Sequence, residues 1–333
     1  MEAFEKNKLA LGIDREKHYL LNIISISDVH INHPHVPEEH TVELLRNIFK
    51  TQEFVNCDLF IIAGDFWDKM MEVAIDVTLP IFSYIIDLLK RCKKYDIVLR
   101  VLEGTPSHDR KQGHLFEFFN SSQGIGCDLR YVSETSIEKN LKLGIDILYI
   151  PDNAHANTGV TKDFVKDLLE ERGLQQVDYT IMHGAFPHQI PPEHHANLHD
   201  PDYYLGITRK YIFNGHIHTP SVYEERLLAQ GSFNRNRCGE PEDKGYWYIE
   251  SCRSGIEGDV RRFMVNEDAW PFVDIDLVDY TEEEAKEKLN RILTPDTFRI
   301  GSAIRMVVRA GHEIGHITGA YKRANDHVRW IED

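Results

Sequence analysis

Apolar residues along the chain follow two kinds of pattern, and each kind predicts one type of element. Short continuous apolar runs bounded by polar residues predict buried strands. These runs fall at 19–27, 58–65, 96–104, 146–152, 178–186 and 211–218. Apolar residues at helical spacing alternate with them, at 40–55, at 73–95 with a local break at Pro80, and at 161–173. Strands that bracket helices in this way favour an α/β fold with largely buried sheets.

The pattern changes after Arg226, where strand-like runs follow one another with few helices between them. A helix with an acidic first turn, a further strand and a terminal helix come next, at 281–293, 302–310 and 321–333. This change places a soft boundary near 265–275. We therefore expect a large domain over 1–265 and a small C-terminal α+β domain over 266–333.

Composition limits the classes of protein to which the chain belongs. Its 42% hydrophobic and 28% charged residues are typical of a soluble globular protein, and no apolar run approaches the roughly 20 residues that span a bilayer. Five scattered cysteines without a CxxC pair favour the reducing cytoplasm, or its nucleoid, over a disulfide framework or a cysteine zinc site. The net charge of -16 argues against nucleic-acid binding by electrostatics alone, but clustered carboxylates suit a nuclease that binds divalent metals.

Polar clusters follow five of the predicted strands at their carboxyl ends, the edge where open α/β sheets bind ligands. Each cluster by itself is typical of a turn, although the two imidazoles of Gly-His-x-His can point at one ligand. Together they supply carboxylates and imidazoles, which suit Mn²⁺, Fe²⁺ or Zn²⁺ better than Ca²⁺ or Mg²⁺. The clusters are SDVH with Asp28 and His30, GDFWD with Asp65 and Asp68, PSHD with Ser107, His108 and Asp109, MHG with His183, and GHIH with His216 and His218.

The order and spacing of these clusters resemble the calcineurin-like metallophosphoesterase superfamily. Its pattern is D-x-H, GD-x-x-D, GNH-D/E, a lone His and GH-x-H, and four of the five motifs match outright over 28–233. The segment 215–250, with Gly231-Ser232, Gly239-Glu240 and Lys244-Gly245, is more narrowly similar to SbcD/Mre-type nuclease subunits of DNA double-strand-break repair complexes, including the compact version that bacteriophages encode. The resemblance implies a sandwich of two central mixed β-sheets flanked by helices, plus a small C-terminal α+β capping domain.

The resemblance also implies a role for each matched residue. It implies two divalent metal ions, Mn²⁺ in preference to Mg²⁺, Fe²⁺ or Zn²⁺, with Asp65 bridging them. His108 matches the catalytic histidine that protonates the leaving oxygen or stabilises the transition state. Asp68 and Asp109 would fix the orientation of the imidazoles. The first ion would be held by Asp28, His30 and His218, and the second by His183 and His216.

The third motif departs from the family. Pro106-Ser107-His108 stands where the family has Gly-Asn-His, whose asparagine oxygen is a ligand of the second metal. A serine hydroxyl is shorter and a poorer ligand. Ser107 then binds through a water, or the loop around Gly104 moves inward, or the second site is weaker and more dependent on manganese. We expect a weakened but working site.

These residues predict a metal-dependent DNA nuclease, exonuclease or endonuclease, in which two metals activate a hydroxide for phosphodiester hydrolysis. By resemblance the chain would form a homodimer and work with an SbcC-type coiled-coil ATPase that brings DNA to this acidic protein, with no membrane partner. We predict that four basic residues contact DNA phosphates. The alternative is that they are ordinary surface charges. The four residues are Arg209, Lys210, Arg235 and Arg237.

Other interpretations are open at this point. A phosphatase or phosphodiesterase acting on nucleotides or phosphoproteins shares the same metal motifs, and a non-catalytic scaffold subunit accounts for the missing asparagine. The run from His312 to His316 matches the zinc-protease pattern H-E-x-x-H, but its glycines oppose the helix that such a site needs, so we favour a turn. The loop that carries His188, His194, His195 and His199 has three interpretations, which are an extra metal site, a substrate lid and a solvated segment. We favour the solvated segment.

Overall fold

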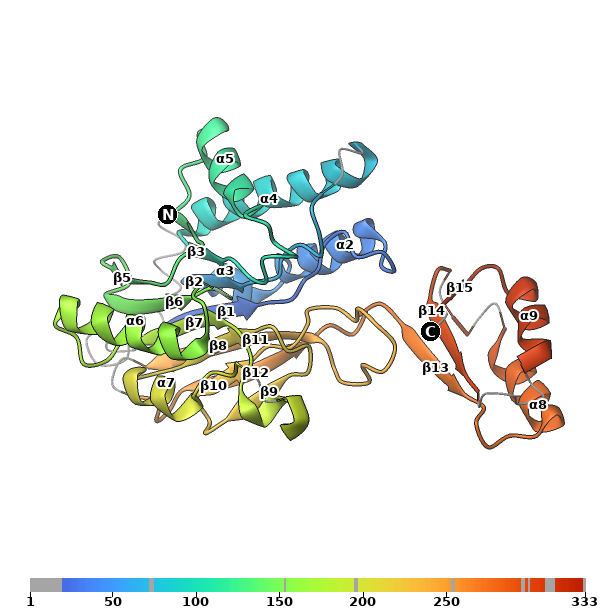
Figure 1. Ribbon diagram of the computed structural model, residues 1–333. Helices are drawn as coiled ribbons and strands as arrows, with labels where there is room; N and C mark the ends of the chain where they lie inside the picture. The colour runs from blue at the N-terminus through green and yellow to red at the C-terminus, as the bar shows by residue number, and fades with distance from the viewer. Residues whose placement is uncertain are drawn as a thin grey trace.

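The computed structural model describes residues 20–71, 75–152, 154–194, 197–252, 255–294, 297–298, 300–308 and 315–331. Within them, two six-stranded mixed sheets pack together, helices cover the outer faces, and a third, three-stranded sheet forms a smaller unit to one side (Figure 1). The predicted α/β sandwich of two mixed sheets flanked by helices is confirmed.

The first sheet has the strand order β12-β11-β1-β2-β3-β4. Strands β1 to β4 run parallel, whereas β11 pairs antiparallel with both β1 and β12. Every residue of β2 and β3 is buried, as their apolar runs predict. The strands are β1 Leu20–Ile26, β2 Leu59–Ala63, β3 Val98–Leu102, β4 Leu129–Val132, β11 Gly245–Cys252 and β12 Val260–Val265.

The second sheet has the strand order β5-β6-β7-β8-β10-β9. Its four middle strands run parallel, and β5 and β9 close the two edges in the antiparallel direction. All residues of β7 and β8 are buried. The strands are β5 Ser136–Asn140, β6 Ile145–Ile150, β7 Tyr179–His183, β8 Ile212–Gly215, β9 Ser221–Tyr223 and β10 Leu227–Ala229.

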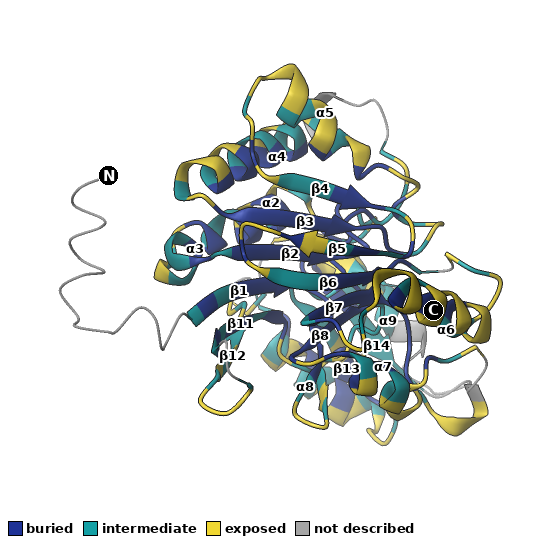
Figure 2. Cartoon of the chain, turned by 90° about the vertical axis from the view of Figure 1, so that its left-hand side faces the viewer, coloured by how far each residue is buried: buried dark blue, intermediate teal, exposed yellow. Residues whose placement is uncertain are grey.

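Three apolar layers hold the main body together. Between the sheets, Ile23 and Ile61 of the first sheet pack in one cluster with Tyr149 and Phe213 of the second. The central strands are buried and the helices turn exposed faces outward (Figure 2). Among the described residues, no helix combines the length and apolarity needed to cross a membrane. The helices are α2 Glu38–Ile48, α3 Gln52–Asn56, α4 Ile75–Tyr95 and α5 His114–Ser122 over the first sheet, and α6 Thr158–Arg172 and α7 Pro201–Ile207 over the second.

Local signals explain where two of the predicted helices differ from the structure. The helix expected at 40–55 divides in two because the Thr51 side chain accepts a hydrogen bond from the Phe54 N–H and starts α3 there. The break expected at Pro80 is wrong, since α4 continues through it. A proline early in a helix removes one backbone hydrogen bond, and burial of the face that carries Ile85 offsets that loss.

The C-terminal unit, here called the cap, has a core of its own. Its three strands run parallel, and α8 packs against them. The helix expected at 321–333 instead runs over Gly315–Ala324 and ends before Asn325. A short strand follows it at Arg329–Trp330. His312 and Glu313 of the H-E-x-x-H pattern lie outside the described residues. The elements are β13 Phe272–Asp276, α8 Glu282–Ile292, β14 Ala303–Val307, α9 Gly315–Ala324 and β15 Arg329–Trp330.

The cap packs beside the loops that follow β1 and β10. The Asn234 side chain accepts a hydrogen bond from the Trp270 N–H at 2.6 Å, and the Trp270 ring lies 4.8 Å from the ring of His40. Arg329 donates to the backbone oxygen of Pro34. The strand β12 ends at Val265, and the cap follows it in the chain. The contacts above place the cap on the side of the molecule that carries these loops.

Candidate metal centre

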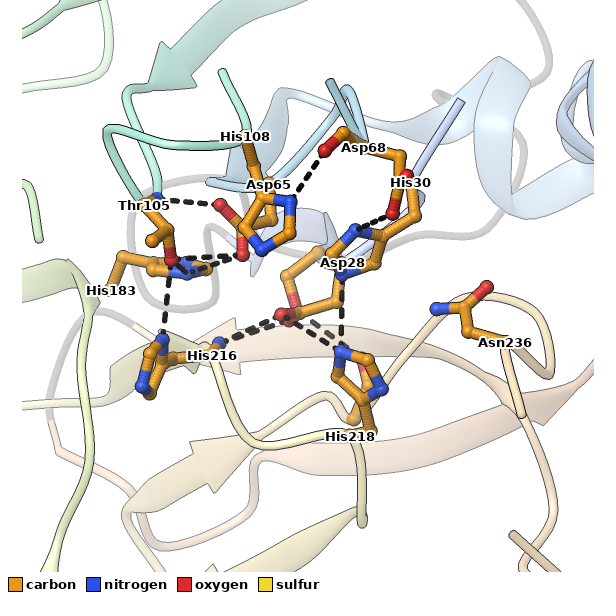
Figure 3. Close-up of polar contacts among 12 residues, drawn as sticks. Asp28, His30, Asp65, Asp68, Thr105, His108, His183, His216, His218 and Asn236 are labelled. Atoms are coloured by element: carbon orange, nitrogen blue, oxygen red, sulfur yellow. Dashed lines mark hydrogen bonds and ion pairs between the residues drawn. The ribbon is translucent and has the colours of Figure 1, made fainter. Parts of the chain in front are cut away.

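The carboxyl ends of five strands from both sheets bring the polar clusters together at one edge of the sandwich (Figure 3). Strands β1, β2 and β3 contribute from the first sheet, and β7 and β8 from the second. The cleft between them has a volume of about 240 Å³ and is also lined by His33, Asn236 and Arg237. The side chains that meet here are Asp28, His30, Asp65, His108, His183, His216 and His218.

Three overlapping groups of these side chains can each bind a metal ion. In each group the candidate ligand atoms lie within 4.8 Å of one another. Neighbouring groups share His30 or Asp65, so the donors form one continuous set. The groups are Asp28, His30 and His218; His30, Asp65 and His108; and Asp65, His183 and His216.

The backbone at the ligand positions is strained. Asp28, His30 and Asp65 have φ values of 47°, 50° and 48°, in the left-handed region that non-glycine residues rarely adopt. Such residues cost about 1–3 kcal/mol each and cluster at functional sites. Gly64 makes the turn after β2 possible, because a Cβ atom there would lie 2.3 Å from Nδ1 of His183.

The imidazoles of His30 and His218 face each other through their Nε2 atoms, which are 3.1 Å apart. Nδ1 of His30 lies 3.3 Å from a carboxylate oxygen of Asp68, and Nδ1 of His218 lies 2.9 Å from one of Glu240. A carboxylate beside Nδ1 favours the tautomer with the proton there, in which both Nε2 atoms present lone pairs to the same point. Two facing lone pairs repel unless a cation lies between them, so this donor set fits a metal ion.

His183 and Asp65, at the other end of the cleft, also fit a metal ion. Nδ1 of His183 lies 2.8 Å from the Ala63 backbone oxygen, and its Nε2 lies 3.2 Å from a carboxylate oxygen of Asp65. Burial alone lowers the pKa of His183, but the negative charge of Asp65 outweighs it and raises the pKa to about 10. The pair therefore attracts positive charge, which a metal ion supplies as well as a proton does.

The two aspartates expected to orient imidazoles behave differently. Asp68 fits the expectation, because its carboxylate faces His30 and its backbone oxygen lies 2.6 Å from Nδ1 of His108. Asp109 does not contact an imidazole and instead accepts hydrogen bonds from the backbone N–H groups of Asp65, Trp67 and Gly104, at 2.7–3.0 Å. Asp109 therefore positions the loops after β2 and β3.

Thr105, and not Ser107, lies against the second group of ligands. The Ser107 side chain is exposed, and its backbone oxygen accepts a hydrogen bond from Arg110. Thr105 Oγ1 lies 3.1 Å from Asp65 Oδ2, 3.5 Å from His183 Nε2 and 3.4 Å from His216 Nδ1. The expectation for Ser107 is corrected, because the loop bulges outward at Pro106 and Ser107 and brings Thr105 to the ligands.

Glu240 is a second residue that the sequence analysis missed. Besides facing His218, its buried carboxylate accepts a hydrogen bond from the Asn236 N–H at 3.1 Å and lies 3.2 Å from the Lys244 ammonium. Burial alone raises the pKa of Glu240, but the hydrogen bond with His218 and the charge of Lys244 lower it to about 2. The Gly-Glu turn after the last metal motif was the signal in the sequence.

The four basic residues expected to contact DNA lie in different places. Arg209 and Lys210 precede β8, at the edge opposite the ligands; Arg209 pairs with Asp178, and Lys210 is buried against backbone oxygens. This pair lies away from the metal ligands, because the ligands follow β8 and the pair precedes it; its contact with DNA stays a prediction. Arg235 donates to the backbone oxygens of Glu240 and Ala269. Arg237 alone lines the cleft, with 76% of its side chain exposed.

The two loop histidines whose side chains the structure describes, His188 and His199, differ in burial. His188 is exposed and stacks on Tyr223, with ring centroids 4.6 Å apart. His199 is buried under Phe186 and Tyr204. His195 lies outside the described residues, and His194 ends a short 3₁₀ turn over Pro192–His194. His188 fits the solvated loop that we expect, whereas His199 is buried instead.

Comparisons with known proteins give distant likenesses to solved structures. No protein-family model matches it, and no curated protein matches its sequence. One solved structure of an unspecified protein is 10% identical, covers 74% of this chain and 99% of its own, and has a TM-score of 0.46. The TT1561 protein of Thermus thermophilus is 9% identical, with coverage of 64% and 90% and a TM-score of 0.37. Likenesses at this level carry no argument about function.

Proposed function

We propose that the chain is a metal-dependent nuclease of the SbcD type, within the calcineurin-like metallophosphoesterases, which hydrolyses DNA phosphodiesters with two divalent ions, preferably Mn²⁺. The observation that carries this proposal is the continuous set of carboxylates and imidazoles around Asp65, with the lone pairs of His30 and His218 directed at one point. A structural histidine normally has its hydrogen bonds satisfied by protein partners, whereas these two nitrogens face each other.

Metal ions bound in this cleft would polarise a phosphate and lower the pKa of an attacking water. The residues of the chain would orient the substrate and move the proton. The contact between Nδ1 of His108 and the Asp68 backbone oxygen leaves Nε2 of His108 facing the cleft, where it can protonate the departing oxygen (Figure 3). Arg237 lies at the rim of the cleft and can donate to a phosphate oxygen.

The segment after β8 resembles that of SbcD-type nucleases, which also have a C-terminal capping domain. Both features favour a nuclease over a phosphatase. The net charge of -16 predicts weak affinity for DNA by the chain alone. We therefore propose that a coiled-coil ATPase partner and a second copy of this chain supply the remaining DNA contacts in the cytoplasm.

Digestion of linear double-stranded DNA in manganese tests this proposal. His108→Ala should lower the rate by about 10²–10⁴, the usual loss when a general acid is removed. His114→Ala is the matched control, because His114 is an exposed histidine at the start of α5. A small ester, bis-p-nitrophenyl phosphate, is assayed in parallel.

The outcomes separate the candidate functions. DNA degradation that His108→Ala abolishes and His114→Ala leaves intact supports the nuclease. Turnover of the ester without DNA cleavage favours a nucleotide phosphodiesterase, or a nuclease that needs its ATPase, and cyclic nucleotides as substrates distinguish these two, because they carry a phosphodiester. Turnover of neither substrate by folded, manganese-loaded protein favours a scaffold subunit.

A further inference from the structure

A second cavity of about 210 Å³ adjoins the metal centre and shares His216 with it. Its walls come from the loop between β6 and α6 and from the loop between β7 and α7. The first loop contributes Asp152 and His155, and the second contributes Ala185 and His199. The cavity thus opens beside the group of ligands formed by Asp65, His183 and His216, and apart from His216 it is lined by residues outside that group.

The lining of this cavity suits an uncharged group that forms hydrogen bonds. No lysine or arginine is among the described residues that line it. It does not suit a second phosphate, which needs cations or several free backbone N–H groups. Its polar lining consists of hydroxyls, amides, imidazoles and one carboxylate, which match the hydroxyls of a sugar and the edge of a nucleobase.

His199 is the residue of this lining that points most directly to a ligand. It is only 7% exposed, yet its Nδ1 is buried and has no hydrogen-bond partner among the described residues. Its backbone N–H donates to the Ala185 oxygen at 2.9 Å, which fixes the ring beside the cavity. Gly184 leaves room for the ring, because a Cβ atom there would lie 2.8 Å from Nε2 of His199. A buried polar atom without a partner is costly, so the wall of the cavity carries an unmet hydrogen bond at His199.

The size of the cavity limits what it can accept. Pockets that enclose drug-sized ligands measure about 300–1,000 Å³, so a cavity of about 210 Å³ accepts one sugar and base but not a base pair. A nucleotide must therefore be unpaired to enter it while its phosphate lies at the metal centre. Unpairing and unstacking a base has a free-energy cost, which is smallest where the base is already single-stranded.

We propose that this cavity, the nucleoside pocket, binds the unpaired nucleoside next to the scissile phosphate. The proposal rests on the proposed function for the identity of the phosphate site. It specifies the substrate as a nucleic-acid end or single strand instead of an intact duplex. His199 and Asp152 then act as specificity residues that contact the nucleoside and take no part in the reaction.

Calorimetric titration of the manganese-loaded chain with thymidine 5′-monophosphate, thymidine 3′-monophosphate and inorganic phosphate tests the pocket without requiring turnover. At least one nucleotide should bind about tenfold more tightly than phosphate, because the nucleoside adds buried contacts. Thr158→Trp fills the pocket from the first turn of α6 and should remove that advantage. Val160→Trp is the matched control, since Val160 lies two residues further along α6, is 43% exposed and does not line the pocket.

Each result bears on one proposal. Nucleotides that bind no more tightly than phosphate, or equal losses in Thr158→Trp and Val160→Trp, would overturn the nucleoside pocket even if DNA is degraded. A nucleotide advantage that only Thr158→Trp removes would support the pocket even if the chain hydrolyses nothing, and the nuclease proposal would then fail alone. In an active chain, Thr158→Trp should also raise KM for single-stranded DNA, and Val160→Trp should not.

Discussion

The backbone N–H of Thr105 donates to Oδ1 of Asp65 at 2.5 Å, and the Thr105 hydroxyl lies 3.1 Å from the other oxygen of the same carboxylate. One residue of the loop after β3 therefore fixes both oxygens of the side chain at the middle of the ligand set. The hydroxyl also faces His183 and His216. Thr105 thus joins the set of candidate ligands from the loop that carries His108.

We predict that Thr105→Ala weakens the binding of one of two manganese ions by about 10–100-fold, the usual loss when a group that supports metal ligands is removed. Ser107→Ala should leave both ions unaffected, because the Ser107 side chain is exposed. Titration of manganese into metal-free protein measures both variants. Loss of an ion in Ser107→Ala, with normal binding by Thr105→Ala, would reverse the assignment.

The carboxylate of Glu240 should matter for the other ion. Glu240→Gln replaces the charged acceptor beside Nδ1 of His218 by a neutral amide, so His218 becomes a weaker donor and the tautomer is less firmly set. We expect about tenfold weaker manganese binding at the group formed by Asp28, His30 and His218. Asp243→Asn, a nearby exposed acid, is the control. Equal affinities for both variants would mean that Glu240 only stabilises its own loop.

Gly104 is required by close packing at the end of β3. A Cβ atom there would lie 2.1 Å from the Asp65 backbone nitrogen. Gly104→Ala should therefore displace Asp65, reduce manganese binding and destabilise the fold by about 1–3 kcal/mol. Gly206→Ala is the comparison, since a Cβ atom there meets no atom within 4 Å. Thermal unfolding and manganese titration of both variants provide the measurement, and unchanged binding by Gly104→Ala would refute the packing argument.

The ion pair between Arg100 and Glu138 should make stability depend on acid pH. Arg100 lies on β3 and is 4% exposed, and it reaches Glu138 on β5 with a contact of 2.6 Å, so the pair links the two sheets. Burial alone raises the pKa of Glu138, but the hydrogen bond and charge of Arg100 lower it to about 2 from its ordinary 4.5. The lowered pKa means that the contribution, at most about 3 kcal/mol, is fully present above pH 4.5 and is lost as pH falls towards about 2.

Urea unfolding of metal-free protein at neutral pH and near the lower end of this window tests the pair. Wild type should lose more stability on acidification than Glu138→Gln, which has no carboxylate to protonate. Parallel losses in the two proteins would show that Glu138 does not contribute to the acid sensitivity.

The continuous apolar runs predicted an α/β fold with buried strands, and the sandwich came from the resemblance of the polar motifs to metallophosphoesterases. The candidate ligands could be listed because they follow those strands directly. Asp28, Asp65 and His183 could be placed from strand ends alone. Thr105 could not, because adjacency to His108 suggested Ser107, and only the path of the loop shows which residue turns inward.

Residues close together in the sequence lie far apart in space where a strand separates them. Arg209 and Lys210 lie close in sequence to the Gly-His-Ile-His motif, but β8 separates them from it. Four residues of strand span about 13 Å, which carries the chain from one edge of the sheet to the other. Glu240 was missed for the opposite reason, because a turn 22 residues beyond His218 brings it back to that imidazole.

The rate of bis-p-nitrophenyl phosphate hydrolysis as a function of manganese concentration, for wild type beside Asp65→Asn, tests the central claim most directly. Asp65 joins the groups of metal ligands, so its neutralisation affects the whole set. The account predicts a rate that rises with manganese and saturates in wild type, and that falls by about 10³ or more in Asp65→Asn. A folded wild-type chain that binds manganese but hydrolyses the ester no faster than manganese alone would contradict it.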